Sequence, residues 1–166
     1  HTPDSLENAL RAARTIGDGR VLCVFGCGGD RDRGKRPMMG KLAAELAEVA
    51  VVTSDNPRSE PPEQILAEIE AGVIAHGGPR LTPDALPAAE RGYLIQGDRR
   101  AAIELAVGAA RAGDVVLIAG KGHEKTQIIG KRHEPFDDSA EAQSALARRS
   151  ARLRGQSRQG RQGEGG

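Results

Sequence analysis

Polar and charged side chains follow three apolar stretches of this sequence, and their types suit the binding of a small charged molecule. The stretches end before the loop 26–36, the turn 55–58 and the loop 120–124. An arginine in the turn carries a planar guanidinium that can hold a carboxylate through two hydrogen bonds. The side chains supplied are of both charges: Arg31, Arg33, Lys35 and Arg36; Asp55, Asn56 and Arg58; Lys121, His123 and Glu124. This mixture would suit a zwitterion with carboxylate and ammonium groups.

Buried strands must position these loops. The runs 21–25, 49–53 and 115–119 are continuously apolar, which is typical of strands covered on both faces of a parallel sheet, and a shorter run lies at 93–95. Helical spacing between the runs predicts helices that begin near Pro3, Pro37, Pro61, Asp98 and Asp138, with Thr2, Asp98 and Asp138 as N-caps. The second helix is expected to place Met38, Leu42, Leu46 and Val49 along its buried side, and the last helix is expected to end near Arg149. A hairpin or edge strand is predicted between residues 126 and 133. The expected fold is therefore α/β, a Rossmann-like, doubly wound, mainly parallel sheet whose carboxyl edge gathers the three loops.

Composition excludes several classes of function. The 166 residues carry 24 basic and 23 acidic side chains, so the net charge of +1 indicates neither a nucleic acid nor an anionic membrane as partner. Three aromatic residues give no platform for stacking single-stranded nucleic acid. No apolar run is long enough to span a bilayer. Cys23 lies on one predicted strand and Cys27 lies just after it, a poor geometry for a disulfide, which favours a reducing cytoplasm.

Two short motifs in the first loop suggest other chemistry. Residues 29–35 fit the phosphate-loop pattern G-x-x-x-x-G-K, so a stand-alone phosphate- or nucleotide-binding module is one alternative. Arg36 replaces the hydroxyl residue that would hold magnesium, and Pro37 lacks a backbone donor. Cys27 and Arg33 have the spacing of thiolate phosphatases, although no hydroxyl residue follows the arginine. The histidines have no shared metal-ligand spacing, so no metal site is predicted.

Three segments together resemble the C-terminal domain of the Mur ligases. They are Val24-Phe25-Gly26-Cys27-Gly28-Gly29-Asp30-Arg31-Asp32, Asp55-Asn56-Pro57-Arg58 and Gly120-Lys121-Gly122-His123-Glu124. Within this family the resemblance is to members that add meso-diaminopimelate to UDP-N-acetylmuramoyl-L-alanyl-D-glutamate in peptidoglycan synthesis. It covers roughly residues 1–150, and His1-Thr2-Pro3 resembles the link from the family's central domain. Residues 151–166 are rich in Gly, Gln, Arg and Ser and are expected to form a disordered tail.

The resemblance implies a division of labour. The N-terminal UDP-binding domain and the central ATPase domain of the family are absent here, and ATP and Mg²⁺ would bind mainly to the latter. This part alone is expected to be inactive and to contribute no catalytic residue. Meso-diaminopimelate would be held by Arg31, Asp55, Asn56, Pro57, Arg58, Gly120 and Glu124. Arg58 would grip the carboxylate that lysine lacks. A monomeric, cytoplasmic enzyme is expected, and a Mur ligase that adds a different amino acid is the nearer alternative.

Overall fold

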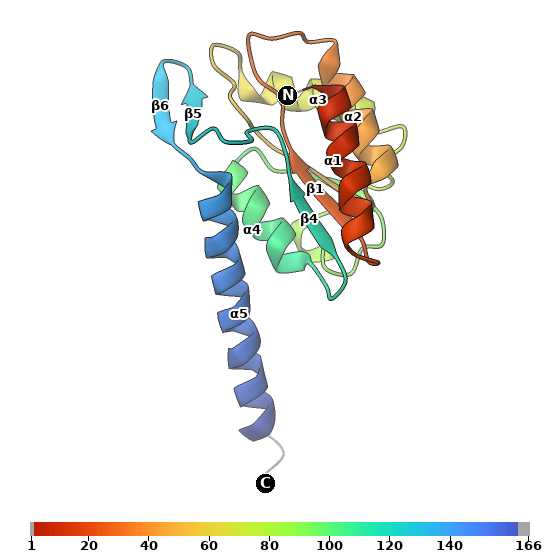
Figure 1. Ribbon diagram of the computed structural model, residues 1–166, viewed down its shortest axis with the longest axis vertical. Helices are drawn as coiled ribbons and strands as arrows, with labels where there is room; N and C mark the ends of the chain where they lie inside the picture. Colours follow the sequence, from red (N-terminus) through yellow and green to blue (C-terminus); the bar gives the residue numbers. More distant parts are fainter. Residues whose placement is uncertain (1, 163–166) are drawn as a thin grey trace.

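A four-stranded parallel sheet forms the centre of the computed structural model, which describes residues 2–162 (Figure 1). The strand order is β3-β2-β1-β4, with β1 at Val21–Phe25, β2 at Val49–Val52, β3 at Gly92–Ile95 and β4 at Val115–Ile118. Leu22 pairs with Val49, and Val21 pairs with Val115. The predicted α/β, doubly wound, mainly parallel fold is confirmed. The order reverses between β1 and β4, so ligand-binding loops are expected at the carboxyl ends of these strands.

Helices cover both faces of this sheet (Figure 1). On one face lie α1 (Pro3–Ile16), α2 (Lys35–Leu46) and α3 (Pro62–Val73). On the other lies α4 (Arg99–Ala109), against which α5 (Asp138–Gln162) packs. Side chains of β1 alternate between the layers, since Cys23 and Phe25 join the first core while Leu22 and Val24 join the second. The short helix η1 (Pro83–Ala85) lies in the connector before β3.

The hairpin and two helix caps follow the sequence prediction. Strands β5 (Thr126–Ile129) and β6 (Arg132–Pro135) pair in antiparallel fashion. Thr2 accepts a hydrogen bond from the Ser5 amide, and Asp98 accepts one from the Ala101 amide. At α5 the prediction was wrong by one residue, because the carboxylate of Asp137, and not that of Asp138, accepts the first amides.

The buried face of α2 differs from the predicted one. Large apolar residues, including Met38, were expected to point inward, yet Met38 is 54% exposed. The buried residues are instead Arg36, Met39, Gly40, Ala43 and Ala44. Small side chains bring α2 close to α3: a Cβ atom on Gly40 would lie 2.2 Å from the Ile69 carbonyl oxygen, and one on Gly72 only 1.9 Å from that of Pro37. The close approach of the two helices therefore selects glycine and alanine over larger residues.

The C-terminal helix is longer than predicted. Instead of ending near residue 149, α5 continues to Gln162 and so occupies most of the segment expected to be disordered. Side chains at 151–161 are all exposed, and the last turns extend away from the body of the domain (Figure 1). Arginine, glutamine and alanine have high intrinsic helix propensity, which a prediction based on the lack of apolar residues does not consider. His1 and residues 163–166 lie outside the described residues.

Among residues 2–162, no helix is both long and apolar enough to cross a bilayer. The longest, α5, carries many arginines.

Replacing Gly72 by alanine should destabilise the domain. The added Cβ would meet the Pro37 carbonyl oxygen at 1.9 Å, so α2 and α3 would have to move apart. Overpacking of this kind lowers the free energy of unfolding by about 1–3 kcal/mol. Gly155→Ala is the control, because nothing lies within 4 Å of its Cβ position, and it should leave stability unchanged or slightly higher. Urea unfolding measures both; equal midpoints for the two variants would contradict the close packing.

Candidate functional site

The loops after β1, β2 and β4 meet around a cavity of about 350 Å³ at the carboxyl edge of the sheet. Five of the predicted site residues line it: Arg31, Asp55, Asn56, Arg58 and Glu124. Pro57 and Gly120 are not part of this lining. Pro57 lines a separate hollow, and Gly120 adopts a positive φ of 117°, with its Cβ position 3.4 Å from Asp55 Oδ2. The predicted convergence of three loops is confirmed, and cationic and anionic groups border one space.

A buried ammonium group joins two of these loops. Lys121, only 1% exposed, donates to Asn56 Oδ1 at 3.0 Å and to the Thr126 carbonyl at 2.8 Å, and its Nζ lies 3.2 Å from Asp55 Oδ1. Desolvating a charge is costly unless it is paired and hydrogen-bonded, so these contacts explain why it can be buried. Lys121 therefore acts as a structural link.

Asn56 connects this link to the rim of the cavity. Its Oδ1 also accepts from the Ile128 amide at 3.0 Å, and its Nδ2 donates to Glu124 Oε2 at 2.9 Å. The side-chain amide therefore has partners on both ends. Asn56 orients the carboxylate of Glu124, which is exposed beside the cavity.

Arg58 is held in an unusual backbone conformation. Its φ is +52°, a left-handed value that side chains rarely adopt. The hairpin stabilises it, because the Arg58 amide donates to the Ile128 carbonyl at 3.0 Å and its carbonyl accepts from Gly130 at 2.7 Å. One guanidinium nitrogen, Nη1, donates to the Gly29 carbonyl at 2.8 Å. The other two, Nε and Nη2, have no partner among residues 2–162 and can donate to a ligand.

Two of the glycines in the first loop, Gly28 and Gly29, allow the loop to cross the turn 55–58. A Cβ atom on Gly29 would lie 1.8 Å from the Pro57 carbonyl oxygen, and one on Gly28 would lie 2.9 Å from Arg58 Nη1. The Gly29 amide donates to the Asn56 carbonyl at 2.7 Å. Here the glycines permit contact with a neighbouring loop.

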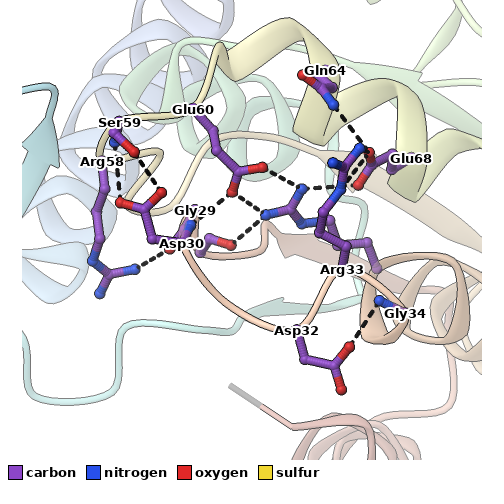
Figure 2. Close-up of polar contacts among 12 residues, drawn as sticks. Gly29, Asp30, Asp32, Arg33, Gly34, Arg58, Ser59, Glu60, Gln64 and Glu68 are labelled. Atoms are coloured by element: carbon purple, nitrogen blue, oxygen red, sulfur yellow. Dashed lines mark hydrogen bonds and ion pairs between the residues drawn. The ribbon is translucent and has the colours of Figure 1, made fainter.

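Sequence reasoning missed the acidic partners of this loop, which Figure 2 shows. Arg36, 1% exposed, pairs with Glu60 and with Glu68, and Arg33 also pairs with Glu68. Hydrogen bonds from Arg33 and then Arg36 lower the pKa of Glu68 to about 2. The pKa of Glu60 is lowered too, mainly by Arg36 and then by the Asp30 amide. No local motif marks these pairs, because the partners lie 24 to 35 residues apart.

A second buried arginine fixes the strand ends from the opposite face. Arg99 donates to the carbonyl of Ser54 at 3.1 Å and to that of Ala119 at 3.2 Å, and it pairs with Asp138 at the start of α5. One guanidinium therefore binds the carbonyls that follow both β2 and β4 and fixes the ends of these strands relative to each other. The site consequently rests on rigid elements.

Neither alternative motif is supported by the geometry. Burial raises the pKa of the Cys27 thiol to about 12, so it is not a thiolate nucleophile at neutral pH, and Arg33 is paired with Glu68. In the phosphate-loop segment, the Gly34 amide donates to Asp32 Oδ1 and the Lys35 amide to the Asp32 carbonyl. These donors are therefore engaged within the loop and do not form a phosphate cradle.

The described residues contain no ready-made cluster of metal ligands. Between residues 2 and 162 there is no group of three or more His, Cys, Asp or Glu side chains that could hold a metal.

Comparison with known proteins identifies the family of this domain. Residues 1–122 match the family described as "Mur ligase, glutamate ligase domain", and the chain belongs to this family. A protein of Synechocystis sp. named UDP-N-acetylmuramoyl-L-alanyl-D-glutamate–2,6-diaminopimelate ligase is 55% identical over 146 residues, which cover 88% of this chain and 26% of that protein. A protein of the same name from Trichormus variabilis is 54% identical over 149 residues, covering 90% and 27%.

A solved structure of a protein with that name superposes with a TM-score of 0.76 at 41% identity. It covers 90% of this chain, which in turn covers 28% of the solved chain. The chain thus spans about a quarter of the length of the curated relatives it matches. The resemblance to the Mur ligases is confirmed, and the domain boundary at residue 150 stays a prediction.

Replacing Glu68 by glutamine should flatten the acid end of the stability profile. A folded-state pKa of about 2, below the ordinary 4.5, means that ionised Glu68 stabilises the fold above pH 4.5. This contribution is lost as pH falls from 4.5 towards 2. Urea unfolding across that range should show a steeper decline for the wild type than for E68Q. Glu63→Gln is the control, an exposed glutamate of the same helix without an ion pair among the described residues. Identical slopes for E68Q and wild type would contradict the pairing.

Proposed function

We propose that this chain is the amino-acid-binding part of an ATP-dependent ligase that joins meso-2,6-diaminopimelate to UDP-N-acetylmuramoyl-L-alanyl-D-glutamate in peptidoglycan synthesis. The names of the relatives support the reaction. The observation that carries the proposal is the geometry of Arg58, whose guanidinium is anchored at one nitrogen and lines the cavity with two donors available. A guanidinium with two adjacent donors is suited to a carboxylate.

The charges around the cavity match such an amino acid. Meso-diaminopimelate carries two carboxylates and two amines. Arg31 and Arg58 border the cavity as cations, while Asp55 and Glu124 border it as anions. Arg58 would hold the carboxylate that lysine lacks, and Glu124 would face an ammonium group. Complementary charges of this kind fix orientation and reject a ligand that leaves a partner without its counter-charge.

The role of these residues would be to position a nucleophile. If one end of the amino acid is held by Arg58 and Glu124, the other end is oriented with its amine towards the acyl group to be attacked. Correct orientation and exclusion of water supply a large share of the rate enhancement in bimolecular reactions. Proteins of this family are ATP-dependent, and ATP and Mg²⁺ would bind mainly to parts of the full-length protein outside this chain.

Two alternatives are distinguished by the ligand. A Mur ligase for a different amino acid would keep the loops but would not discriminate through Arg58. A stand-alone phosphate-binding module would bind phosphate at the loop 26–36, where the Gly34 and Lys35 amides are already engaged. We further propose that the full protein works in the cytoplasm as a monomer, without a nucleic acid or membrane partner.

The variant Arg58→Ala in the full-length protein should lower kcat/KM for meso-diaminopimelate by roughly 100-fold, the usual loss when one partner of a buried charge pair is removed. Activity with L-lysine should change much less, because lysine has no second carboxylate to lose. Arg11→Ala, an exposed arginine on α1 away from the cavity, is the matched control. An unchanged preference for meso-diaminopimelate over lysine would show that Arg58 does not bind the second carboxylate of the amino acid.

Titration of this chain with meso-diaminopimelate, followed by NMR, should shift the amides of residues 29–31, 56–58 and 120–124. L-lysine and inorganic phosphate serve as parallel titrations. Phosphate shifts centred on residues 29–35 would support the stand-alone module instead. A response to lysine as strong as that to meso-diaminopimelate would favour a ligase for another amino acid.

A further inference from the structure

Two consecutive peptide groups of the first loop, the first of them at Gly28 in the wall of the cavity, are each hydrogen-bonded at both ends. The carbonyl of Gly28 accepts from Arg36 at 3.0 Å, while the amide of the same peptide group, that of Gly29, donates to the Asn56 carbonyl at 2.7 Å. In the next peptide group, the Gly29 carbonyl accepts from Arg58 Nη1 at 2.8 Å, and the Asp30 amide donates to Glu60 Oε2 at 2.7 Å (Figure 2). The planar Gly29–Asp30 peptide group is therefore hydrogen-bonded to Glu60 at one end and to the guanidinium of Arg58 at the other.

This second peptide group is held against its backbone preference. Asp30 has a φ of +54°, a left-handed value that is unfavourable for any residue with a Cβ atom. Rotating the Gly29–Asp30 peptide group by half a turn would return Asp30 to negative φ, and Gly29 tolerates the accompanying change in its own ψ. The same rotation would turn the Gly29 carbonyl away from Arg58. The hydrogen bond to Glu60 opposes this flip, because only the present orientation points the Asp30 amide at the carboxylate.

Glu60 is itself fixed. Its Oε1 accepts from Arg36 Nη1 at 3.1 Å, and its Oε2 accepts from Arg36 Nη2, so a buried guanidinium holds both carboxylate oxygens. The adjacent Ser59 donates through its hydroxyl to Asp30 Oδ1. Residues 59 and 60 therefore bind the side chain and the amide of the same residue, Asp30. Charge-assisted hydrogen bonds of this kind are among the strongest that a loop can form.

We propose that Glu60 is a positioning residue that sets the guanidinium of Arg58 through the Gly29–Asp30 peptide group, and so determines the selection of an amino acid with a second carboxylate. The inference rests on the proposed function. Glu60 does not line the cavity and acts only through the peptide plane. Losing it frees the Gly29 carbonyl to rotate, and Arg58 then loses the anchor that aims it at the ligand.

The test measures the ratio of kcat/KM for meso-diaminopimelate to that for L-lysine in the full-length protein. Glu60→Ala should lower this ratio at least about tenfold, the loss expected for one hydrogen bond to a charged group. The double variant with Arg58→Ala should show the same ratio as Arg58→Ala alone, because Glu60 acts through Arg58. KM for ATP should not change. Glu68→Ala is the matched control, since Glu68 also pairs with Arg36 but does not contact the peptide group.

The outcomes separate the two proposals. If Arg58→Ala lowers the ratio and Glu60→Ala does not, or if their effects add in the double variant, the role of Glu60 is overturned and the proposed function stands. If Arg58→Ala leaves the ratio of the kcat/KM values unchanged, the proposed function is overturned, and the role of Glu60 is overturned with it. Glu60→Gln keeps one oxygen for the Asp30 amide and should retain more of the ratio than Glu60→Ala, which gives a readout even if the alanine variant does not fold. The fall in the ratio should be accompanied by fast hydrogen exchange of the Asp30 amide in Glu60→Ala. In Glu68→Ala the same amide should stay protected.

Discussion

The buried ammonium of Lys121 is the interaction on which the site depends most. Its nitrogen lies between Asp55, Asn56 and the carbonyl of Thr126, so the loops after β2 and β4 and the start of the hairpin share one charge. A buried charge without partners would cost several kcal/mol, roughly 3–5 when one member of a pair is removed. If the loops separated, the Lys121 ammonium would be exposed to solvent or would lose its partners. The positions of Arg58 and Glu124 follow from this link, because both residues adjoin the segments that it joins.

Much of the fold could be predicted because its signals are local. Continuous apolar runs indicated β1, β2 and β4, and Thr2 and Asp98 cap helices as their side chains suggest. The buried face of α2 could not be predicted in the same way. Its small residues pack well only because α3 lies close to them, and this depends on tertiary structure. The length of α5 was underestimated for a related reason, since a polar composition indicates the absence of a core rather than the absence of a helix.

In the candidate site, too, some features could be predicted from local sequence and others depend on tertiary contacts. Convergence of the three loops could be expected, because parallel strands share a carboxyl edge. The sequence did not distinguish residues that face the cavity from those that support it. Lys121 is a structural link, although its loop looked like a ligand-binding segment, and Asn56 orients Glu124. Glu60 and Glu68 lie on another part of the chain from Arg36, so their role depends on contacts that no short motif encodes. Pairs of this kind become visible only when the loops are placed in space.

The burial of the two cysteines has a practical consequence. Cys23 is inaccessible within β1 and Cys27 is 8% exposed, and burial raises the pKa of both thiols to about 12. Alkylating reagents attack the thiolate, so the folded domain should react slowly and the opened chain at the ordinary rate of a free cysteine. Because Cys23 lies at the centre of the sheet and Cys27 lies beside the cavity, the two thiols report different events. Labelling of Cys27 alone would indicate local opening of the first loop, whereas labelling of both would indicate unfolding of the sheet. The chain thus carries its own chemical probes for distinguishing motion at the site from loss of the fold.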